Sequence, residues 1–117
     1  MPPITEPYEL DGVTVGVTPI SLVSGTTTVN ATVVTGVFQF WLDLSPMAKG
    51  DEFLFVISER VEATGGIRRT VLEQRFLGVQ AEVWASPVLI LRNGWNATLE
   101  RVAGTDRAFD ASVRQIS

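Results

Sequence analysis

Residues 37–44 read Val37-Phe38-Gln39-Phe40-Trp41-Leu42-Asp43-Leu44. Large apolar side chains occupy positions 38, 40, 42 and 44, and residues that alternate in this way share one face of an extended strand. The other face carries Val37, Gln39, Trp41 and Asp43, and is therefore semi-polar. One apolar face and one semi-polar face are typical of a strand in a two-layer β-sandwich.

A hairpin is expected directly after this strand. Residues 52–62 place Phe53, Phe55, Ile57 and Val61 on one face. The segment Ala63-Thr64-Gly65-Gly66 supplies residues that tolerate a tight loop, and residues 67–77 return as the second strand. The charged residues of the pair predict a projecting hairpin with a wet outer face.

The rest of the chain also favours strands. Residues 10–34 are rich in Val, Thr, Ile and Gly, which predicts two or three short strands because β-branched side chains pack well on a pleated surface. Further strands are expected at residues 79–84, 87–91, 95–102 and 108–116. No stretch of ten or more residues shows a clean helical period with caps. We therefore expect an all-β, single-domain antiparallel β-sandwich of about eight strands, with a jelly-roll or immunoglobulin-like arrangement.

The N-terminal segment differs in composition from the rest of the chain. Three of the first nine residues are proline, which favours an extended path without regular hydrogen bonds. We expect residues 1–9 to form an arm outside a sandwich domain of residues 10–117. The arm is either a frayed terminus or a segment that lies on a neighbouring subunit through Pro3, Ile4 and Tyr8.

The amino-acid composition excludes several classes of function for this protein. The 117 residues include no histidine and no cysteine, so imidazole catalysis, thiol nucleophiles, disulfides and zinc fingers are excluded. Nine Lys and Arg stand against thirteen Asp and Glu, and the formal charge of −4 argues against a nucleic-acid partner. No apolar run is long enough for a membrane helix, and the first residues do not resemble a secretory signal. Charged residues make up 19% of the chain, below the usual share of about 25%, so we expect another chain to cover part of the surface, as in a homo-oligomer.

Two groups of carboxylates are the available candidates for metal binding or catalysis. Asp43, Asp51 and Glu52 flank one turn and carry the oxygen ligands that Ca²⁺ prefers, but the D-x-D-x-D-G pattern is absent. Asp106 and Asp110 are the only acid pair to nominate for glycoside hydrolysis, and the better account of Asp106 is a turn residue that hydrogen-bonds its own backbone. We predict no enzymatic activity, no metal and no cofactor.

Tryptophan provides the best candidate binding residues. Trp84 and Trp95 lie near expected strand ends, with Arg92, Asn93 and Asn96 close in sequence. Such a group either stacks on a sugar ring, as in a carbohydrate-binding module or receptor-binding tip, or fills the core or a protein interface. The second reading is favoured because aromatic rings usually occupy cores and interfaces. Trp84 and Trp95 are therefore partner-binding candidates beside Pro3, Ile4 and Tyr8.

Several segments together resemble small virion structural proteins of tailed bacteriophages and prophages. The resemblance covers about the last two thirds of the chain and contains no catalytic residue. The segments are Gly36-Val37-Phe38-Gln39-Phe40-Trp41-Leu42-Asp43-Leu44-Ser45, Gly50-Asp51-Glu52-Phe53, Pro87-Val88-Leu89-Ile90-Leu91, Gly94-Trp95, Ala103-Gly104-Thr105-Asp106-Arg107 and Ser112-Val113-Arg114-Gln115.

The resemblance implies a setting for the protein. It implies a component of the virion, made in the bacterial cytoplasm, whose partners are the major capsid protein or other virion proteins. The expected role is a capsid decoration or cement protein that binds and stabilises the head shell. A neck, head-tail connector or tail structural protein is the alternative, because a closed ring asks for similar features.

Overall fold

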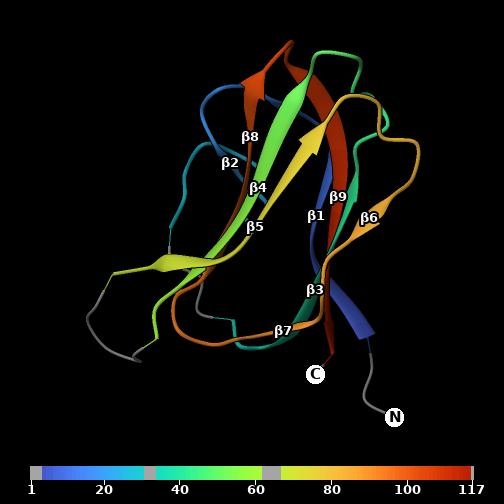
Figure 1. Cartoon of the computed structure of the whole chain (residues 1–117). Helices are drawn as coiled ribbons and strands as arrows, with labels where there is room; N and C mark the ends of the chain where they lie inside the picture. Colours follow the sequence, from blue (N-terminus) through green and yellow to red (C-terminus); the bar gives the residue numbers. More distant parts are fainter. Residues whose placement is uncertain (1–3, 31–33, 62–66, 117) are drawn as a thin grey trace.

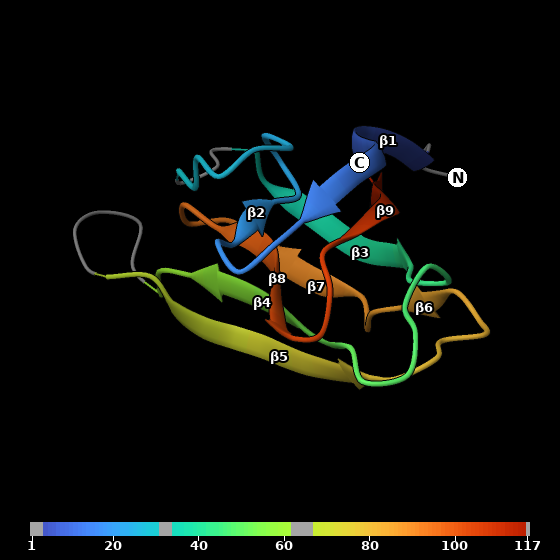
Figure 2. The same cartoon turned by 90° about the horizontal axis from the view of Figure 1, so that it is seen from above.

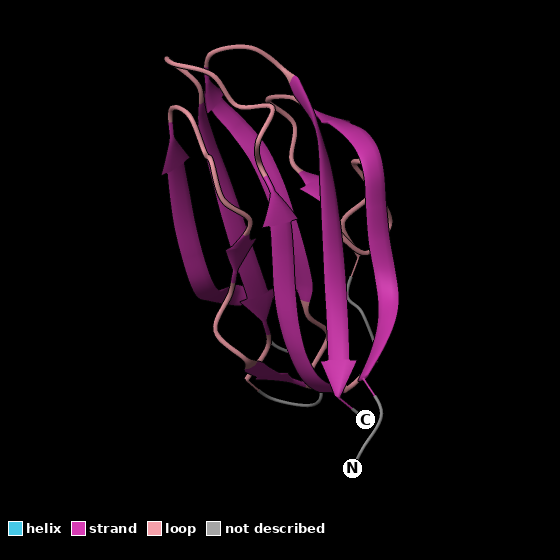
Figure 3. Ribbon diagram, turned by 90° about the vertical axis from the view of Figure 1, so that its right-hand side faces the viewer, coloured by secondary structure: helices cyan, strands magenta, loops and turns pink. Residues whose placement is uncertain are grey.

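The computed structural model describes residues 4–30, 34–61 and 67–116. These residues form nine strands and no helix, so the prediction of an all-β chain is confirmed (Figures 1 and 3). The strands are β1 (Ile4–Val15), β2 (Ile20–Ser21), β3 (Gly36–Asp43), β4 (Glu52–Glu59), β5 (Arg69–Leu77), β6 (Trp84–Ala85), β7 (Leu89–Leu91), β8 (Asn96–Ala103) and β9 (Arg107–Ile116). None of the described residues belongs to a helix long and apolar enough to cross a membrane.

Two antiparallel sheets form the sandwich (Figure 2). The first has the order β1-β9-β3-β6, with β7 also paired to β3, and the second has the order β2-β8-β4-β5. The expected hairpin is present as β4 and β5, whose register runs from Glu52 opposite Leu77 to Glu59 opposite Arg69. The predicted loop of residues 63–66 lies outside the described residues. The single-domain antiparallel β-sandwich is thus confirmed.

The core lies between the two sheets and follows the period-two pattern. Phe38, Phe40, Leu42 and Leu44 are at most 1% exposed, as are Phe53, Phe55 and Ile57 from the facing sheet. Val61 was expected on the same face but is 92% exposed, because β4 ends at Glu59 and the alternation ends with it. The inward positions of these two strands therefore build the centre of the core.

Trp95 is the largest side chain that the core encloses completely. Its ring lies 4.8 Å from the ring of Phe38 and 5.9 Å from that of Phe40, measured between centroids. The indole N–H donates a 2.7 Å hydrogen bond to the carbonyl oxygen of Val34. The apolar body of the side chain and its one polar atom are therefore both accommodated, as burial of tryptophan requires.

The N-terminal segment corrects the sequence-based boundary at residue 9. Residues 4–9 are the first half of β1 and pair with β9, with Thr5 opposite Gln115 and Tyr8 opposite Val113. Pro7 is accommodated because it lies on an edge strand, within a register shift between Thr5 and Tyr8, where no ladder hydrogen bond is required of it. Residues 4–9 are thus part of the sandwich and not an arm, and Pro3 lies outside the described residues.

Asp51 joins the turn between β3 and β4 to the turn between β8 and β9. Its carboxylate accepts hydrogen bonds from the backbone N–H of Ala48 at 2.9 Å and of Thr105 at 3.1 Å, and from Nε of Arg107 at 2.8 Å. These donors lower the pKa of Asp51 from 3.8 to about 2, the Ala48 N–H being the largest cause. Gly104 is required beside this carboxylate, because a Cβ at this position would lie 2.1 Å from Oδ1.

Replacement of Trp95 by alanine should destabilise the fold by about 3–5 kcal/mol, because it leaves a large cavity and an unpaired carbonyl oxygen. Denaturant unfolding followed by circular dichroism measures the loss. The matched control is Trp41→Ala on the outer face of the sheet, which should cost about 1 kcal/mol or less. Equal losses in the two variants would contradict this account of the core.

Asp51→Asn should lower the free energy of unfolding at neutral pH. Because the folded-state pKa lies below 3.8, the charged carboxylate stabilises the fold above about pH 4, and this contribution is lost as the pH falls toward 2. Thermal unfolding from pH 7 to pH 2 should therefore show a higher midpoint temperature for the wild type at neutral pH, and this gap in midpoint temperature should close in acid. A gap that stays constant over this range would rule out the ion pair and hydrogen bonds as its source.

Candidate functional site

Four aliphatic side chains form a row across the outer face of the first sheet. Ile90 of β7 lies opposite Val37 of β3, Val37 lies opposite Ile116 of β9, and Ile116 lies opposite Ile4 of β1. Ile90 is 79% exposed and Ile4 is 68% exposed. We call these four residues the apolar row. An exposed aliphatic row that crosses four strands is a candidate contact surface.

Trp41 and Arg114 lie further along the same face. The guanidinium carbon of Arg114 is 4.2 Å from the centroid of the Trp41 ring, which is a cation–π contact. The indole N–H of Trp41 donates a 3.1 Å hydrogen bond to Gln39, whose side-chain amide donates in turn to the carbonyl oxygen of Ser86. These contacts hold the Trp41 ring beside the apolar row, and Trp41 lines one hollow of about 180 Å³ together with Ile4, Val37 and Ile116 of the row.

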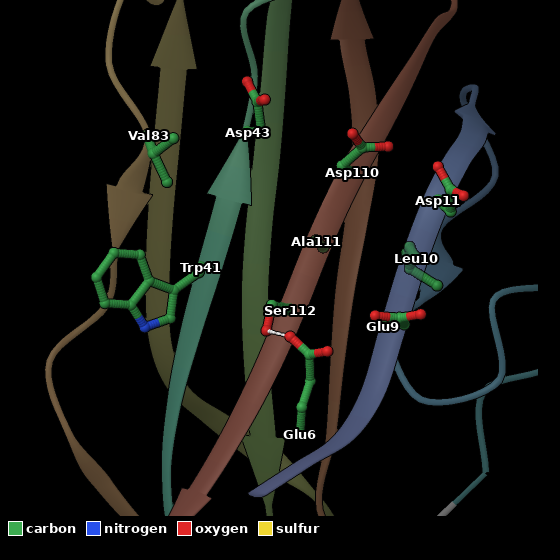
Figure 4. A pocket seen from close by; sticks show the side chains of 10 residues that line it. All are labelled: Glu6, Glu9, Leu10, Asp11, Trp41, Asp43, Val83, Asp110, Ala111 and Ser112. Atoms are coloured by element: carbon green, nitrogen blue, oxygen red, sulfur yellow. Dashed lines mark hydrogen bonds between the residues drawn. The ribbon is translucent and has the colours of Figure 1, made fainter. Parts of the chain in front are cut away.

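A shallow groove of about 280 Å³ continues past Trp41 (Figure 4). Carboxylates dominate its lining. They are Glu6, Glu9, Asp11, Asp43 and Asp110, and we call them the acidic groove. In Figure 4 they come from β1, β3 and β9, with Trp41 at one side. The outer face thus changes from aliphatic near the start of β1 to anionic near the middle of the sheet.

Two neighbouring carboxylates of the groove titrate differently. The hydroxyl of Ser112 donates a hydrogen bond to Glu6, and this bond lowers the pKa of Glu6. Glu6 in turn raises the pKa of Glu9, first through a hydrogen bond between the two glutamate side chains and then through its negative charge. Glu6 therefore keeps its negative charge to lower pH than Glu9 does.

Asp43 and Asp110 face each other directly across β3 and β9. Like charges at opposed positions destabilise a sheet. Each carboxylate also accepts a backbone hydrogen bond: Asp43 from the Ser45 N–H of the following turn at 3.1 Å, and Asp110 from the Gly12 N–H at 2.7 Å, at a register shift of β1. Among the described residues, no three acidic side chains are placed to hold one metal ion.

The residues that the sequence analysis nominated for binding lie in different parts of the structure. Ile4 belongs to the apolar row, whereas Tyr8 points inward and its ring lies 6.3 Å from that of Trp95. Trp84 is half-buried against Phe55 and Phe76, at 5.5 and 5.2 Å between ring centroids. Trp95 is enclosed in the core and has no surface to offer a partner. Trp84 and Trp95 therefore do not form an exposed sugar-stacking pair.

The nominated carboxylates are also separated. Asp51 is held by its turn contacts, and Asp106 forms a 2.6 Å ion pair with Arg101. Asp110 instead lines the acidic groove. Asp106 thus binds the Arg101 side chain, whereas Asp110 lies within β9 and accepts from the backbone of β1, so the two carboxylates have different partners.

Sequence reasoning did not nominate Trp41, Ile90 and Ile116 as binding residues. The outward positions of residues 37–43 were visible in the alternation, but the register that brings Ile90 and Ile116 beside Val37 is set by pairing between distant segments. Comparison with protein-family models, curated proteins and solved structures finds no match.

Glu6→Ala should lower the pKa of Glu9, because it removes the hydrogen bond and the charge that raise it. Carbon-detected NMR titration of the side-chain carboxyl groups measures this value. Glu100→Ala, which removes a glutamate from another strand, is the control and should leave the Glu9 titration unchanged. An unchanged Glu9 pKa in Glu6→Ala would show that the two side chains do not interact.

Proposed function

We propose that this chain is a non-enzymatic virion structural protein of a tailed bacteriophage, acting as a capsid decoration or cement protein that binds and stabilises the head shell. The resemblance of its segments to small virion proteins supplies the setting. The observation that carries the binding role is the exposed apolar row, which continues into the acidic groove on the same sheet face.

The chemistry of this face defines the complementary surface. Burial of the apolar row supplies a hydrophobic contribution, since Ile4 and Ile90 together expose most of their side chains. The carboxylates of the acidic groove favour lysine or arginine opposite them and disfavour nucleic acid. The fitting partner is therefore a capsid protein surface with aliphatic side chains at one end and basic side chains at the other.

Copy number in purified particles tests the placement. Particles from a strain whose phage or prophage encodes the chain are purified and analysed by quantitative mass spectrometry. Hundreds of copies per particle would support head decoration. Six or twelve copies would overturn that placement in favour of the neck or tail, and absence from particles would overturn the virion role.

A variant pair tests the binding face. The double variant Ile4→Asp, Ile90→Asp should reduce incorporation into particles at least about tenfold, because it places charges within the contact without touching the core. Val17→Asp is the matched control: Val17 is 62% exposed and lies beyond the opposite end of β1. Incorporation of the double variant at the control level would remove the apolar row from the mechanism.

A further inference from the structure

The sheet edges of this sandwich are protected unequally. An unpaired strand edge offers N–H and C=O groups to another chain, and proteins usually block such edges with short strands, bulges, proline or charge. β1 carries Pro7 and two register shifts, and β2 and β6 have two residues each. β5 has nine residues and, among the described residues, pairs only with β4. In Figure 2 it forms the outer border of its layer.

The regular part of β5 runs from Leu72 to Leu77. A register shift against β4 lies between Leu72 and Thr70, so Val71 is the bulged residue that ends this part. Proline and glycine are absent from β5. The segment from Leu72 to Leu77 is thus regular, and its outer edge is unpaired among the described residues.

The outward side chains of β5 are complementary to themselves. An antiparallel pairing of two copies that sets Gln74 opposite Gln74 of the second copy also sets Glu73 opposite Arg75, twice by symmetry. The same register sets Leu72 opposite Phe76 on the inner face and Val71 opposite Leu77 at the ends. A shift by two residues in one direction opposes Glu73 with Glu73, and in the other direction Arg75 with Arg75. Of these three registers, only the first pairs opposite charges.

Glu73 and Arg75 both keep hydrogen-bonding groups that can reach a second copy in this register. Arg75 forms a 2.6 Å ion pair with Glu52 through Nη1, while its Nε is 4.0 Å from Glu73. The side chain of Glu73 is 50% exposed. A guanidinium has five donors, so Arg75 can keep Glu52 and also bind a second carboxylate.

We propose that β5 is a self-association edge at which two copies of this chain pair antiparallel about a two-fold axis through Gln74. The pairing joins the two four-stranded sheets into one continuous eight-stranded sheet. It uses a different part of the molecule from the apolar row, so it is independent of the proposed virion role.

One strand pair of this length buries less area than the roughly 1,200–2,000 Å² of a typical stable interface. The dimer should therefore depend on concentration, with a dissociation constant on the order of micromolar or weaker. Sedimentation equilibrium from about 1 µM to about 1 mM covers this range. A monomer mass throughout would overturn the proposal.

Charge exchange tests the register. Arg75→Glu alone opposes two pairs of glutamates and should weaken dimerisation about tenfold, and Glu73→Arg alone should do the same. The double variant Glu73→Arg, Arg75→Glu restores opposite charges and should recover the dimer. Arg69→Glu, the same charge change on the same strand but outside the paired segment, should leave dimerisation unchanged.

Unfolding curves of each variant separate folding from association. A double variant that folds but stays monomeric, or single variants that dimerise like wild type, would overturn the register.

A single cysteine gives a second test, because the chain has none of its own. Gln74→Cys should form a disulfide-linked dimer under mild oxidation, since directly opposed residues bring the two Cβ atoms within reach. Glu73→Cys should cross-link far less, because its copies are offset along the strands by two residues. Equal cross-linking of the two variants would overturn the two-fold axis at Gln74.

Discussion

The structure depends on the burial of two alternating apolar faces against each other, with Trp95 between them. β3 presents Phe38 and Phe40 to this space, and β4 presents Phe53 and Phe55. The chain has no disulfides, so aromatic packing contributes stability that covalent cross-links supply in many small β domains. Phe40 and Phe55 meet across the sheets at 5.6 Å between centroids, and this contact fixes which faces of β3 and β4 point outward.

The outer surfaces inherit their chemistry from that inner constraint. Because residues 38 and 40 point inward, Val37 and Trp41 must point outward, and pairing with β9 and β7 then places Ile116 and Ile90 beside Val37. On the second sheet, the inward positions of Leu72 and Phe76 leave Glu73 and Arg75 on the outer face of β5. The apolar row and the β5 edge are thus two consequences of one pattern, and they can serve two different contacts.

The turns are fixed by polar contacts and not by the core. Asp51 binds donors from two turns that lie more than fifty residues apart in sequence, and Gly104 gives its carboxylate room. A buried carboxylate is stable only when such donors are present, so this cluster sets the relative position of the two turns. It therefore supports the sheet arrangement that the apolar pattern requires.

The sequence by itself determined the all-β class, the inward residues of β3 and β4 and the hairpin of β4 with β5. Alternation and loop chemistry are local, so they can be read along the chain. Tertiary structure alone decided the conformation of residues 4–9. The prolines predicted an arm, but these residues form a strand that pairs with β9. It also decided that Trp95 lies in the core, and that Ile4, Val37, Ile90 and Ile116 form one row. The physical reason is that register between distant strands depends on the packing of the whole sandwich, which no local pattern encodes.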